Sequence, residues 1–454
     1  MNEQAKSAAV PNPPLQVLGR KIAFSTLVQY AGKITQVVLA VLTLKLISNF
    51  LSENDYGTYA KITEFALFFS TLANLGIFGN LVRIMADKPR DGLVFINALI
   101  LRIITAAAFF VPALLYLYWS GADAGGGSAA GGVAGGAFSG DRIFLYGSVL
   151  FFGALFFDFI TSVCDGMLQA NYLMGRATLA LVAGRVANFL LTLLLIRFVL
   201  LPGSAVSVFL LFAATFTGSV LTAALSIYFV RKKIDWSWGF NKPLIRKIFL
   251  ASLPFGIINI INNLYFRFLP DYFAQGALSD AQFGSFNITF RIAQVLSLFS
   301  TFLMFSVLPG FKEYIDLKHW QKARALFGRI WKILLAAGVA LVVGGSIFGG
   351  FAIELLTHKK YILPEFWFIL PLMLVLAAVS YGYDLILITL FAMEKDSWLL
   401  KRELLALTLA LLFFCFSNVA ESVQVKLFLI ILASIAGESF MVIMGTLKIR
   451  KSFQ

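Results

Sequence analysis

The chain has 454 residues, of which 59% are hydrophobic and only 13% are charged, and phenylalanine alone occupies 47 positions. This composition excludes a water-soluble globular domain, because about 20 apolar residues cross a bilayer once and such a chain has room for roughly a dozen crossings. The net charge is +14, from 37 Lys and Arg against 23 Asp and Glu. In a membrane protein a basic excess is explained first by topology, so nucleic acid is not an expected partner.

Apolar runs and the turn residues between them predict an all-α polytopic membrane protein with twelve transmembrane helices. In chain order the predicted helices cover residues 22–48, 60–85, 92–119, 142–168, 177–201, 204–230, 248–274, 284–309, 328–351, 363–391, 402–418 and 424–447. Between the third and fourth helices, residues 121–140 are mostly glycine and alanine. This predicts a flexible external linker rather than a phosphate-binding loop.

The Lys and Arg residues outside these helices divide unevenly between the two sides of the membrane. If the N-terminus is cytoplasmic, 24 of them fall in cytoplasmic segments and six in external loops. Because positive charge marks cytoplasmic loops, this predicts an integral protein of the cytoplasmic (inner) membrane with both termini in the cytoplasm. We expect cytoplasmic tails at residues 1–21 and 448–454, and a basic linker at 231–247 that lies on anionic lipid headgroups.

The sequence repeats itself at half its length. Residues Leu51–Tyr59 (LSENDYGTY) align with Leu278–Phe286 (LSDAQFGSF) at an offset of 227. An offset that crosses six helices returns the chain to the same side of the membrane, so the halves are parallel repeats. This predicts two pseudo-symmetric six-helix lobes around a central cavity, an N-lobe of residues 22–230 and a C-lobe of residues 248–447.

Polar side chains share one helical face in the first predicted helix and recur in its repeat partner, the seventh. They are Gln29, Lys33 and Gln36 in the first helix, and Asn259, Asn262, Asn263 and Arg267 in the seventh. Exposing such groups to lipid costs several kcal/mol each. We therefore expect both faces to line the cavity.

The second and eighth predicted helices carry opposite charges at related positions. Glu64 lies opposite Arg291 at the repeat offset of 227, and Gln294 follows Arg291 at helical spacing. Opposite charges so placed could pair across the cavity and separate when it opens, which would make them a gate. The alternative is a static ion pair within or near one lobe.

Charged residues also occur in four other predicted helices. Asp158 lies on one face of the fourth helix and Arg185 on one face of the fifth, which favours a bridge between them inside the N-lobe. The alternative is ion coupling by a protonatable Asp158 or by its repeat partner Asp384. Arg102, in the third helix, suits either a structural or a substrate-binding role.

Catalytic and metal-binding patterns are absent from the sequence. The two histidines, His319 and His358, are in loops predicted on opposite faces of the membrane. No Gly-Lys-Ser or Gly-Lys-Thr sequence provides a nucleotide-binding loop. We therefore expect neither a cofactor nor an enzyme activity.

Several short motifs resemble those of one transporter family. They are Phe50–Tyr59 (FLSENDYGTY), Ala73–Gly76 (ANLG) leading to Leu81–Arg83 (LVR), Ser252–Pro254 (SLP) and Phe283–Gly284 (FG). With a basic pair before a polar first helix, they make the chain similar to the Wzx-type polysaccharide flippases of the multidrug/oligosaccharidyl-lipid/polysaccharide (MOP) exporter superfamily. The chain departs from that family at Arg267, where an acidic residue is often found, and Asp271 follows one turn later.

The resemblance implies a V-shaped transporter whose cationic central cavity accepts the pyrophosphate and glycan of a polyprenyl-linked oligosaccharide. It also implies membrane lipids and a polysaccharide polymerase or ligase as partners. The residues agree, because the helices contain more cations than a drug-cation exporter would need. These cations are Lys33, Arg102, Arg267 and Arg291, with Arg185 as a further candidate. We expect the chain to flip polyprenyl-pyrophosphate-linked repeat units from the cytoplasmic to the outer leaflet by alternating access, for surface polysaccharide synthesis.

Two alternatives remain open. A MATE-like cation or drug antiporter would have a cavity dominated by carboxylates and aromatic residues, with Glu64, Asp158 or Asp384 essential. A membrane scaffold without transport activity would tolerate every cavity substitution. The matched polar faces of the two repeats argue against a scaffold.

Overall fold

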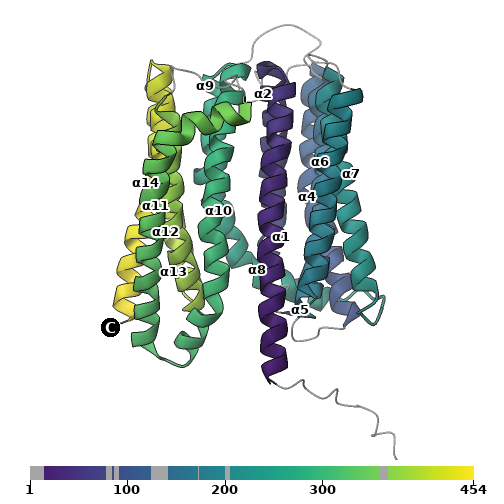
Figure 1. Cartoon of the computed structure of the whole chain (residues 1–454), viewed down its shortest axis with the longest axis vertical. Coiled ribbons are helices and arrows are strands. Elements are labelled where there is room, and N and C mark those ends of the chain that lie inside the picture. Colours follow the sequence, from purple (N-terminus) through teal and green to yellow (C-terminus); the bar gives the residue numbers. More distant parts are fainter. Residues whose placement is uncertain are drawn as a thin grey trace, which may run out of the picture.

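The computed structural model describes residues 15–77, 84–85, 91–123, 142–171, 173–199, 205–357 and 367–453, which are almost entirely helical (Figure 1). The first half forms α1 (Leu15–Phe50), α2 (Glu53–Asn74), α4 (Gly92–Asp123), α5 (Arg142–Ala170), α6 (Met174–Phe198) and α7 (Ala205–Arg231). The second half forms α8 (Lys242–Asn263), η1 (Leu264–Phe268), α9 (Leu269–Ala277), α10 (Asp280–Asp316), α11 (Trp320–Thr357), α12 (Ile369–Ala392), α13 (Asp396–Val419) and α14 (Val423–Ser452). With α8, η1 and α9 taken as one rod, these segments correspond one for one to the predicted helices.

The surface of the helices is that of a membrane protein. Within the described ranges, nine helical segments are long and apolar enough to cross a bilayer. The other long helices, α2, α10 and α13, carry charged residues in their interiors. Large apolar side chains such as Ile347, Phe351 and Phe416 are about two-thirds exposed, which is stable where lipid surrounds the protein and costly in water. The chain is therefore an integral membrane protein.

The helices gather into two lobes that correspond to the two halves of the chain (Figure 1). In the N-lobe, α7 packs against α5 and α6, and α1 packs against α6. In the C-lobe, α12 packs against α10, α11 and α14, and α13 packs against α14. Helix α1 begins and α14 ends at the same end of the molecule, whereas α9 lies at the opposite end (Figure 1). The all-α, two-lobed architecture predicted from the sequence is confirmed.

The lobes meet where α2 and α10 begin, in the two copies of the repeated motif. A methyl group at Gly57 would overlap the main-chain carbonyl of Asp280, and one at Gly284 would lie 3.3 Å from the carbonyl oxygen of Glu53. Residues 53 and 57 are the repeat equivalents of residues 280 and 284. The contact is therefore reciprocal, as a pseudo-two-fold axis between the lobes requires.

Helix α2 is shorter than predicted. It ends at Asn74 because Leu75 and Gly76 adopt left-handed φ angles of 44° and 64°. Gly76 also packs so closely on the backbone of Gly256 in α8 that it has no room for a Cβ atom. The predicted unbroken helix over residues 60–85 is therefore interrupted at Leu75 and Gly76, since only glycine combines the φ angle of Gly76 with such a close approach.

Helices α1 and α8 begin earlier than predicted. Helix α1 begins at Leu15, inside the predicted tail. In α8, Asn241 accepts a hydrogen bond at 3.0 Å from the backbone N–H of Leu244 and thereby caps the helix. The stretch 242–247 of the predicted linker is consequently helical.

The rod that begins with α8 contains a π-helical turn, η1. Pro270, which follows it, has no N–H group and cannot continue the hydrogen-bond ladder of an α-helix. The hydroxyl of Ser434 in α14 donates to the carbonyl oxygen of Tyr265 at 2.7 Å, which satisfies one backbone group in the irregular turn. Such turns are frequent at functional sites, and this one carries Arg267.

Candidate functional site

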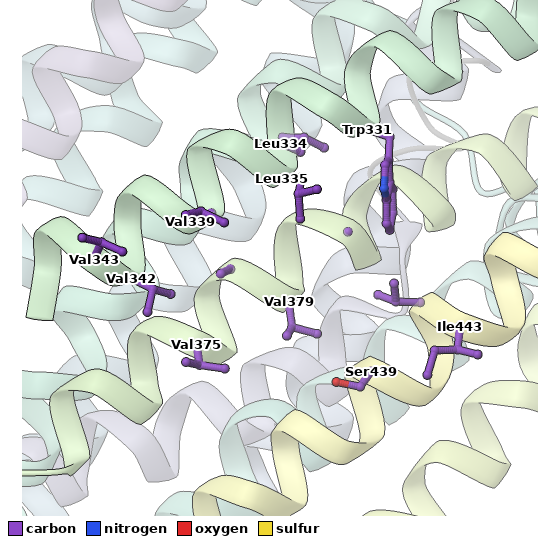
Figure 2. Close-up of a pocket in the computed structure, with 14 residues that line it drawn as sticks. Trp331, Leu334, Leu335, Val339, Val342, Val343, Val375, Val379, Ser439 and Ile443 are labelled. Atoms are coloured by element: carbon purple, nitrogen blue, oxygen red, sulfur yellow. The ribbon is translucent and has the colours of Figure 1, made fainter.

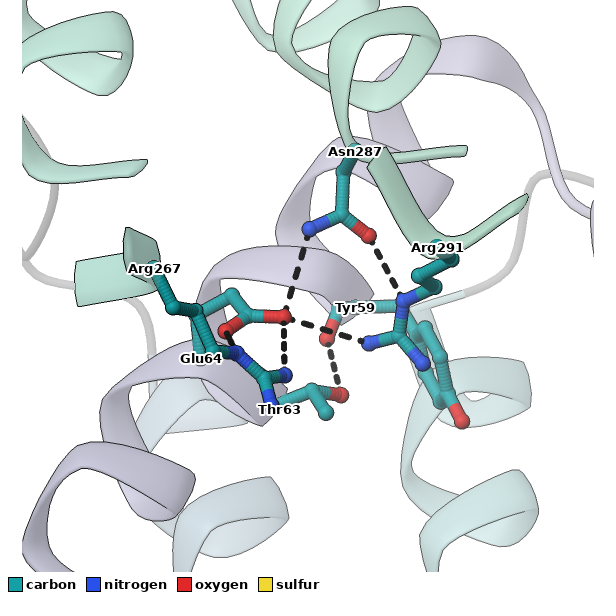
Figure 3. Close-up of polar contacts among 6 residues, drawn as sticks. All are labelled: Tyr59, Thr63, Glu64, Arg267, Asn287 and Arg291. Atoms are coloured by element: carbon teal, nitrogen blue, oxygen red, sulfur yellow. Dashed lines mark hydrogen bonds and ion pairs between the residues drawn. The ribbon is translucent and has the colours of Figure 1, made fainter. Parts of the chain in front are cut away.

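A cluster of charged side chains joins the two lobes (Figure 3). Glu64 of α2 accepts two hydrogen bonds from Arg267 of η1, one from Nε to Oε2 at 2.8 Å and one from Nη2 to Oε1 at 2.9 Å. A planar guanidinium group binds a carboxylate most strongly in this two-pronged geometry. The Glu64 side chain is 3% exposed and that of Arg267 is 19% exposed. The Glu64 carboxylate is thus almost completely buried, whereas the guanidinium group of Arg267 remains partly exposed.

A second arginine approaches the same carboxylate from α10 (Figure 3). Nη2 of Arg291 lies 3.6 Å from Oε1 of Glu64, and Nε of Arg291 donates to Oδ1 of Asn287 at 2.8 Å. The amide of Asn287 in turn donates to Oε1 of Glu64 at 3.3 Å. The structure thus brings Glu64 and Arg291 together, as the repeat offset suggests, but Arg267 is the closer partner of Glu64.

The residues around Glu64 hold it in place. Four residues before Arg291, Asn287 lies on the same face of α10, which positions it between the two charges. One turn before Thr63, the buried ring of Tyr59 stacks on Phe212 with 4.8 Å between the ring centres. The hydroxyl of Thr63 donates to the carbonyl oxygen of Tyr59 at 2.8 Å and therefore does not compete for the carboxylate. Packing against α7 thus positions this part of α2.

A cavity of about 890 Å³ lies between the lobes beside this cluster. Its lining includes Glu64, Lys61, Asp271, Asp280 and Lys426. Asp280 begins α10 directly after α9, which lies at the end of the molecule opposite the termini (Figure 1). Nζ of Lys61 is 2.7 Å from Oδ1 of Asp280, which forms a second ion pair between the lobes. Neither arginine of the cluster is part of this lining. Glu64 therefore contacts both the cavity and the two arginines.

Arg102 lies inside the N-lobe. It is 1% exposed, and its Nη1 atom donates to the main-chain oxygen of Asn74 at 3.0 Å and to the side-chain oxygen at 2.8 Å. Its guanidinium carbon also lies 5.1 Å from the centre of the Phe159 ring. A cation bound to the last carbonyl groups of a helix stabilises its C-terminus. The geometry therefore favours a structural role for Arg102 over a substrate-binding role.

The polar face of α1 lies away from the Glu64 cluster. Helix α1 packs mainly on α6, and Lys33 and Gln36 are half-buried on it. Neither residue is in the lining of the 890 Å³ cavity. The side chain of Gln29 lies outside the described part of the structure. A cavity-facing role for these three residues stays a prediction.

The polar residues predicted on the seventh and eighth helices lie partly buried near the cluster. In α8, the amide of Asn263 donates to the main-chain oxygen of Asn259 at 2.8 Å and to its side-chain oxygen at 3.2 Å. Gln294 is half-buried on α10, one turn after Arg291. Their contact with a substrate stays a prediction.

The remaining predicted residues lie within single lobes, where Asp158 and Asp384 are half-buried and Arg185 is exposed. Asp158 is on α5, which packs against α7, and Arg185 is on α6, which packs against α7 as well. A bridge between Asp158 and Arg185 stays a prediction. Asp384 of α12 accepts a hydrogen bond at 2.6 Å from the hydroxyl of Ser300 in α10. The structure does not bring Asp158 or Asp384 to the ion cluster between the lobes.

Sequence analysis missed two buried acids of the C-lobe, Glu403 and Glu438. Glu403 accepts hydrogen bonds from the phenol groups of Tyr383 at 2.7 Å and Tyr265 at 2.9 Å. Glu438 accepts one from the hydroxyl of Ser380 at 2.5 Å. A carboxylate inside a predicted membrane helix was the signal that could have identified each of them.

A second hollow, of about 500 Å³, lies among α11, α12 and α14 of the C-lobe (Figure 2). Its lining is apolar, with Trp331, Val339, Val379 and Ile443 on its walls and Ser439 as a polar exception. Val339 and Ile443 are more than half exposed on the outer surface. This groove has no charged side chain to bind a polar substrate, and the ion cluster between the lobes remains the candidate site.

Solved structures with this fold are transporters of the MOP superfamily. The inward-facing conformation of a multidrug resistance MATE family transporter is 15% identical with a TM-score of 0.72, covering 94% of this chain and 98% of that chain. The outward-facing conformation of such a transporter is 15% identical with a TM-score of 0.65, covering 95% of each chain. A MOP superfamily transporter from Pyrococcus furiosus, described as having a binding pocket of reverse polarity, is 14% identical with a TM-score of 0.67, covering 95% of each chain. At these identities the likeness shows the fold alone.

The sequence comparison adds the family. No curated protein matches the chain. The family described as polysaccharide biosynthesis protein matches residues 18–315, which is well over half of the chain and includes Glu64, Arg267 and Arg291. The chain therefore belongs to the polysaccharide biosynthesis protein family, that of the Wzx-type flippases, within the MOP transporter superfamily.

Proposed function

We propose that the protein flips a polyprenyl-pyrophosphate-linked oligosaccharide from the cytoplasmic to the outer leaflet of the inner membrane. The observation that carries this proposal is the pair formed by Arg267 and Arg291. Both arginines belong to the C-lobe, and both approach one carboxylate that the N-lobe supplies. In this proposal Glu64 occupies the position that the substrate's pyrophosphate takes when the lobes separate.

The chemistry of the cluster suits a pyrophosphate. The two guanidinium groups face a single Glu64 carboxylate, whereas a pyrophosphate offers more negative charge and more oxygen atoms to the same donors. Arginine binds carboxylates and phosphates through the same planar, two-pronged geometry, so either group can occupy the site. The amides of Asn287 and Gln294 nearby suit the hydroxyl groups of a sugar.

Alternating access follows from the division of the site between the lobes. When the lobes separate at the cluster, Glu64 leaves with α2 while both arginines stay on the C-lobe. The uncompensated guanidinium groups then attract the pyrophosphate, and its departure lets Glu64 return. The lipid chain stays in the bilayer during this cycle, and a polymerase or ligase uses the glycan on the outer side.

The test is to deplete the protein in its own cells and to quantify polyprenyl-pyrophosphate-linked glycan in each membrane leaflet. Wild type, Arg267→Ala, Arg291→Ala and Lys33→Ala are supplied as rescue variants. The control is Arg197→Ala, which removes an exposed arginine at the end of α6. We expect glycan to accumulate in the cytoplasmic leaflet and to be cleared by wild type and Arg197→Ala, but not by Arg267→Ala or Arg291→Ala.

Two results would contradict the proposal. An unchanged leaflet distribution after depletion, together with new sensitivity to cationic dyes, would favour the cation antiporter instead. Full rescue by the double variant Arg267→Ala with Arg291→Ala would show that another site binds the pyrophosphate.

A further inference from the structure

The π-helical turn η1 is held on its C-lobe side by a buried polar network. The hydroxyl of Tyr265 donates to Oε2 of Glu403 in α13 at 2.9 Å and accepts from the side-chain amide of Asn262 in α8 at 3.0 Å. The other carboxylate oxygen, Oε1, accepts from the hydroxyl of Tyr383 in α12 at 2.7 Å. Both Glu403 and Tyr265 are 0% exposed. Each oxygen of this buried carboxylate therefore has a donor, and one of the two donors belongs to η1.

The main chain and the ring of Tyr265 are held by α14. The carbonyl oxygen of Tyr265 accepts a hydrogen bond from the hydroxyl of Ser434 at 2.7 Å. Three residues later on the same face of α14, Gly437 leaves space for the ring, since a methyl group there would lie 2.9 Å from Cδ2 of Tyr265. Close packing of this kind restricts an aromatic ring to one orientation. Helices of the C-lobe thus determine the rotation of η1 about its own axis.

Arg267 leaves the same turn on its other side. Two residues that are two positions apart on a helix lie on nearly opposite faces, so a turn that buries Tyr265 within the C-lobe directs Arg267 away from it. The guanidinium group accordingly reaches Glu64 of the N-lobe at 2.8 Å and 2.9 Å. A π-helical turn departs from the regular hydrogen-bond ladder of an α-helix. The side chain of Tyr265 therefore supplies an orientation that the backbone of η1 alone does not.

We propose that Glu403 is a positioning residue for pyrophosphate binding, an inference that rests on the proposed function. Through the hydroxyl of Tyr265, Glu403 holds η1 in the rotation that presents Arg267 to the N-lobe. Arg267 binds Glu64 in that orientation and keeps the same orientation when the pyrophosphate replaces Glu64. Because Glu403 is enclosed within the C-lobe, it acts on the substrate only through this turn. An arginine that is oriented in advance loses less conformational entropy on binding, which raises the affinity.

The first test needs no substrate and follows thermal unfolding of the purified protein in lipid nanodiscs. Tyr265→Phe removes the hydroxyl but keeps the ring, and it is combined with Glu64→Gln in a double-mutant cycle. If Tyr265 orients Arg267, the ion pair with Glu64 is already weakened in Tyr265→Phe. We therefore expect Glu64→Gln to lower the Tm less in the Tyr265→Phe protein than in wild type. Additive decreases in Tm would overturn the proposal, because independent sites give additive effects.

The matched control is Tyr383→Phe. It removes the other phenol donor from the same Glu403 carboxylate, but Tyr383 belongs to α12 and not to η1. We expect Tyr383→Phe and Glu64→Gln to lower the Tm additively. Equal coupling of Tyr383→Phe and Tyr265→Phe to Glu64→Gln would mean that the network only holds the helices of the C-lobe together, and the positioning role would be wrong.

The second test measures binding of farnesyl diphosphate, a short prenyl diphosphate, by titration calorimetry. Tyr265→Phe and Glu403→Gln, whose amide nitrogen cannot accept a phenol hydrogen bond, should each bind about three- to tenfold more weakly than wild type. In an Arg267→Ala background neither change should weaken binding further, whereas in Arg291→Ala both should. Equal weakening in the two backgrounds, or wild-type affinity in Tyr265→Phe, would overturn the proposal.

The two tests separate failure of this inference from failure of the proposed function. If wild type binds no farnesyl diphosphate, the proposed substrate is wrong, and positioning for its binding fails with it. The unfolding cycle would then still decide whether Tyr265 orients Arg267. If wild type binds the probe and Tyr265→Phe binds it equally well, the flippase proposal stands and the positioning role of Glu403 is wrong.

Discussion

Glu64 is an N-lobe residue that contacts both arginines of the C-lobe. Its carboxylate is enclosed, but the side chains of Arg267 and Arg291 are 19% and 22% exposed, so solvent moderates part of the attraction. Removing one partner of a buried ion pair leaves the other charge uncompensated. The partial exposure of the arginines reduces this cost, which we place at about 1–3 kcal/mol.

Replacing Glu64 with glutamine should strengthen pyrophosphate binding and weaken the fold. The amide keeps the shape of the side chain but no longer competes for the arginines, so we expect about tenfold tighter binding, equivalent to about 1.4 kcal/mol. Titration calorimetry with farnesyl diphosphate measures the affinity, and thermal unfolding measures the stability. Glu313→Gln, an exposed position on α10, is the matched control. Weaker binding in Glu64→Gln would show that Glu64 assists the substrate instead of competing with it.

At the scale of elements, the contact between α2 and α10 depends on the absence of a side chain at Gly57. The helices approach so closely there that the repeated motif packs backbone against backbone. The equivalent glycine, Gly284, has slightly more space, since a methyl group there would lie 3.2 Å from the Tyr56 ring and 3.3 Å from the Glu53 carbonyl. The two halves of the pseudo-symmetric contact are thus unequal.

Gly57→Ala should push α2 and α10 apart and destabilise this conformation by about 1–3 kcal/mol, the usual cost of overpacking. Gly284→Ala should cost less, because its neighbours need to move by only a few tenths of an ångström. Thermal unfolding and the flipping rate provide the measurements. Gly344→Ala in α11, where a methyl group meets nothing within 4 Å, should be neutral. Equal effects at positions 57 and 344 would contradict the close helix contact.

At the scale of the whole molecule, the lobes also touch on either side of the Glu64 cluster. One contact is the start of α2 and α10, where Lys61 pairs with Asp280, and the other is the approach of Gly76 to Gly256. Helices that rock about a central site must break one such contact while they keep the other. The Lys61–Asp280 end lies opposite the termini and is therefore the outer end in the proposed orientation.

Joining Lys61→Cys to Asp280→Cys with a short cleavable cross-linker should stop flipping, because the outer ends of the lobes can no longer separate. Cys415→Ser removes the exposed native thiol, whereas Cys164 is buried. Cleavage of the linker should restore the rate of flipping, which is measured as the movement of farnesyl diphosphate between the leaflets of proteoliposomes. The two single-cysteine variants control for loss of the ion pair. Undiminished flipping by the linked protein would mean that transport does not require this end to open.

Sequence alone determined the class of the molecule and its repeat. The linear chain alone carries the hydropathy pattern, the preference of Lys and Arg for one side of the membrane, and the recurrence of the LSENDYGTY motif. Each helix in lipid must also satisfy the hydrogen bonds of its own backbone. The all-α fold and the two lobes were therefore predictable. The offset of 227 also pointed to Glu64 and Arg291, because a repeat relates positions that a symmetry axis places near each other.

Only the tertiary structure decided which charges meet. Helical spacing gives the face on which a side chain lies, but not which neighbour that face contacts, so Arg102 and Arg267 looked alike in the sequence. Arg102 binds the end of α2 inside the N-lobe. Arg267 lies on a π-helical turn of the C-lobe and binds Glu64 of the N-lobe. That Glu64 and Asp271 line the same cavity likewise depends on how helices of the two lobes pack. These pairings join residues from different helices, and the packing of helices against one another is set by the whole molecule rather than by any local pattern.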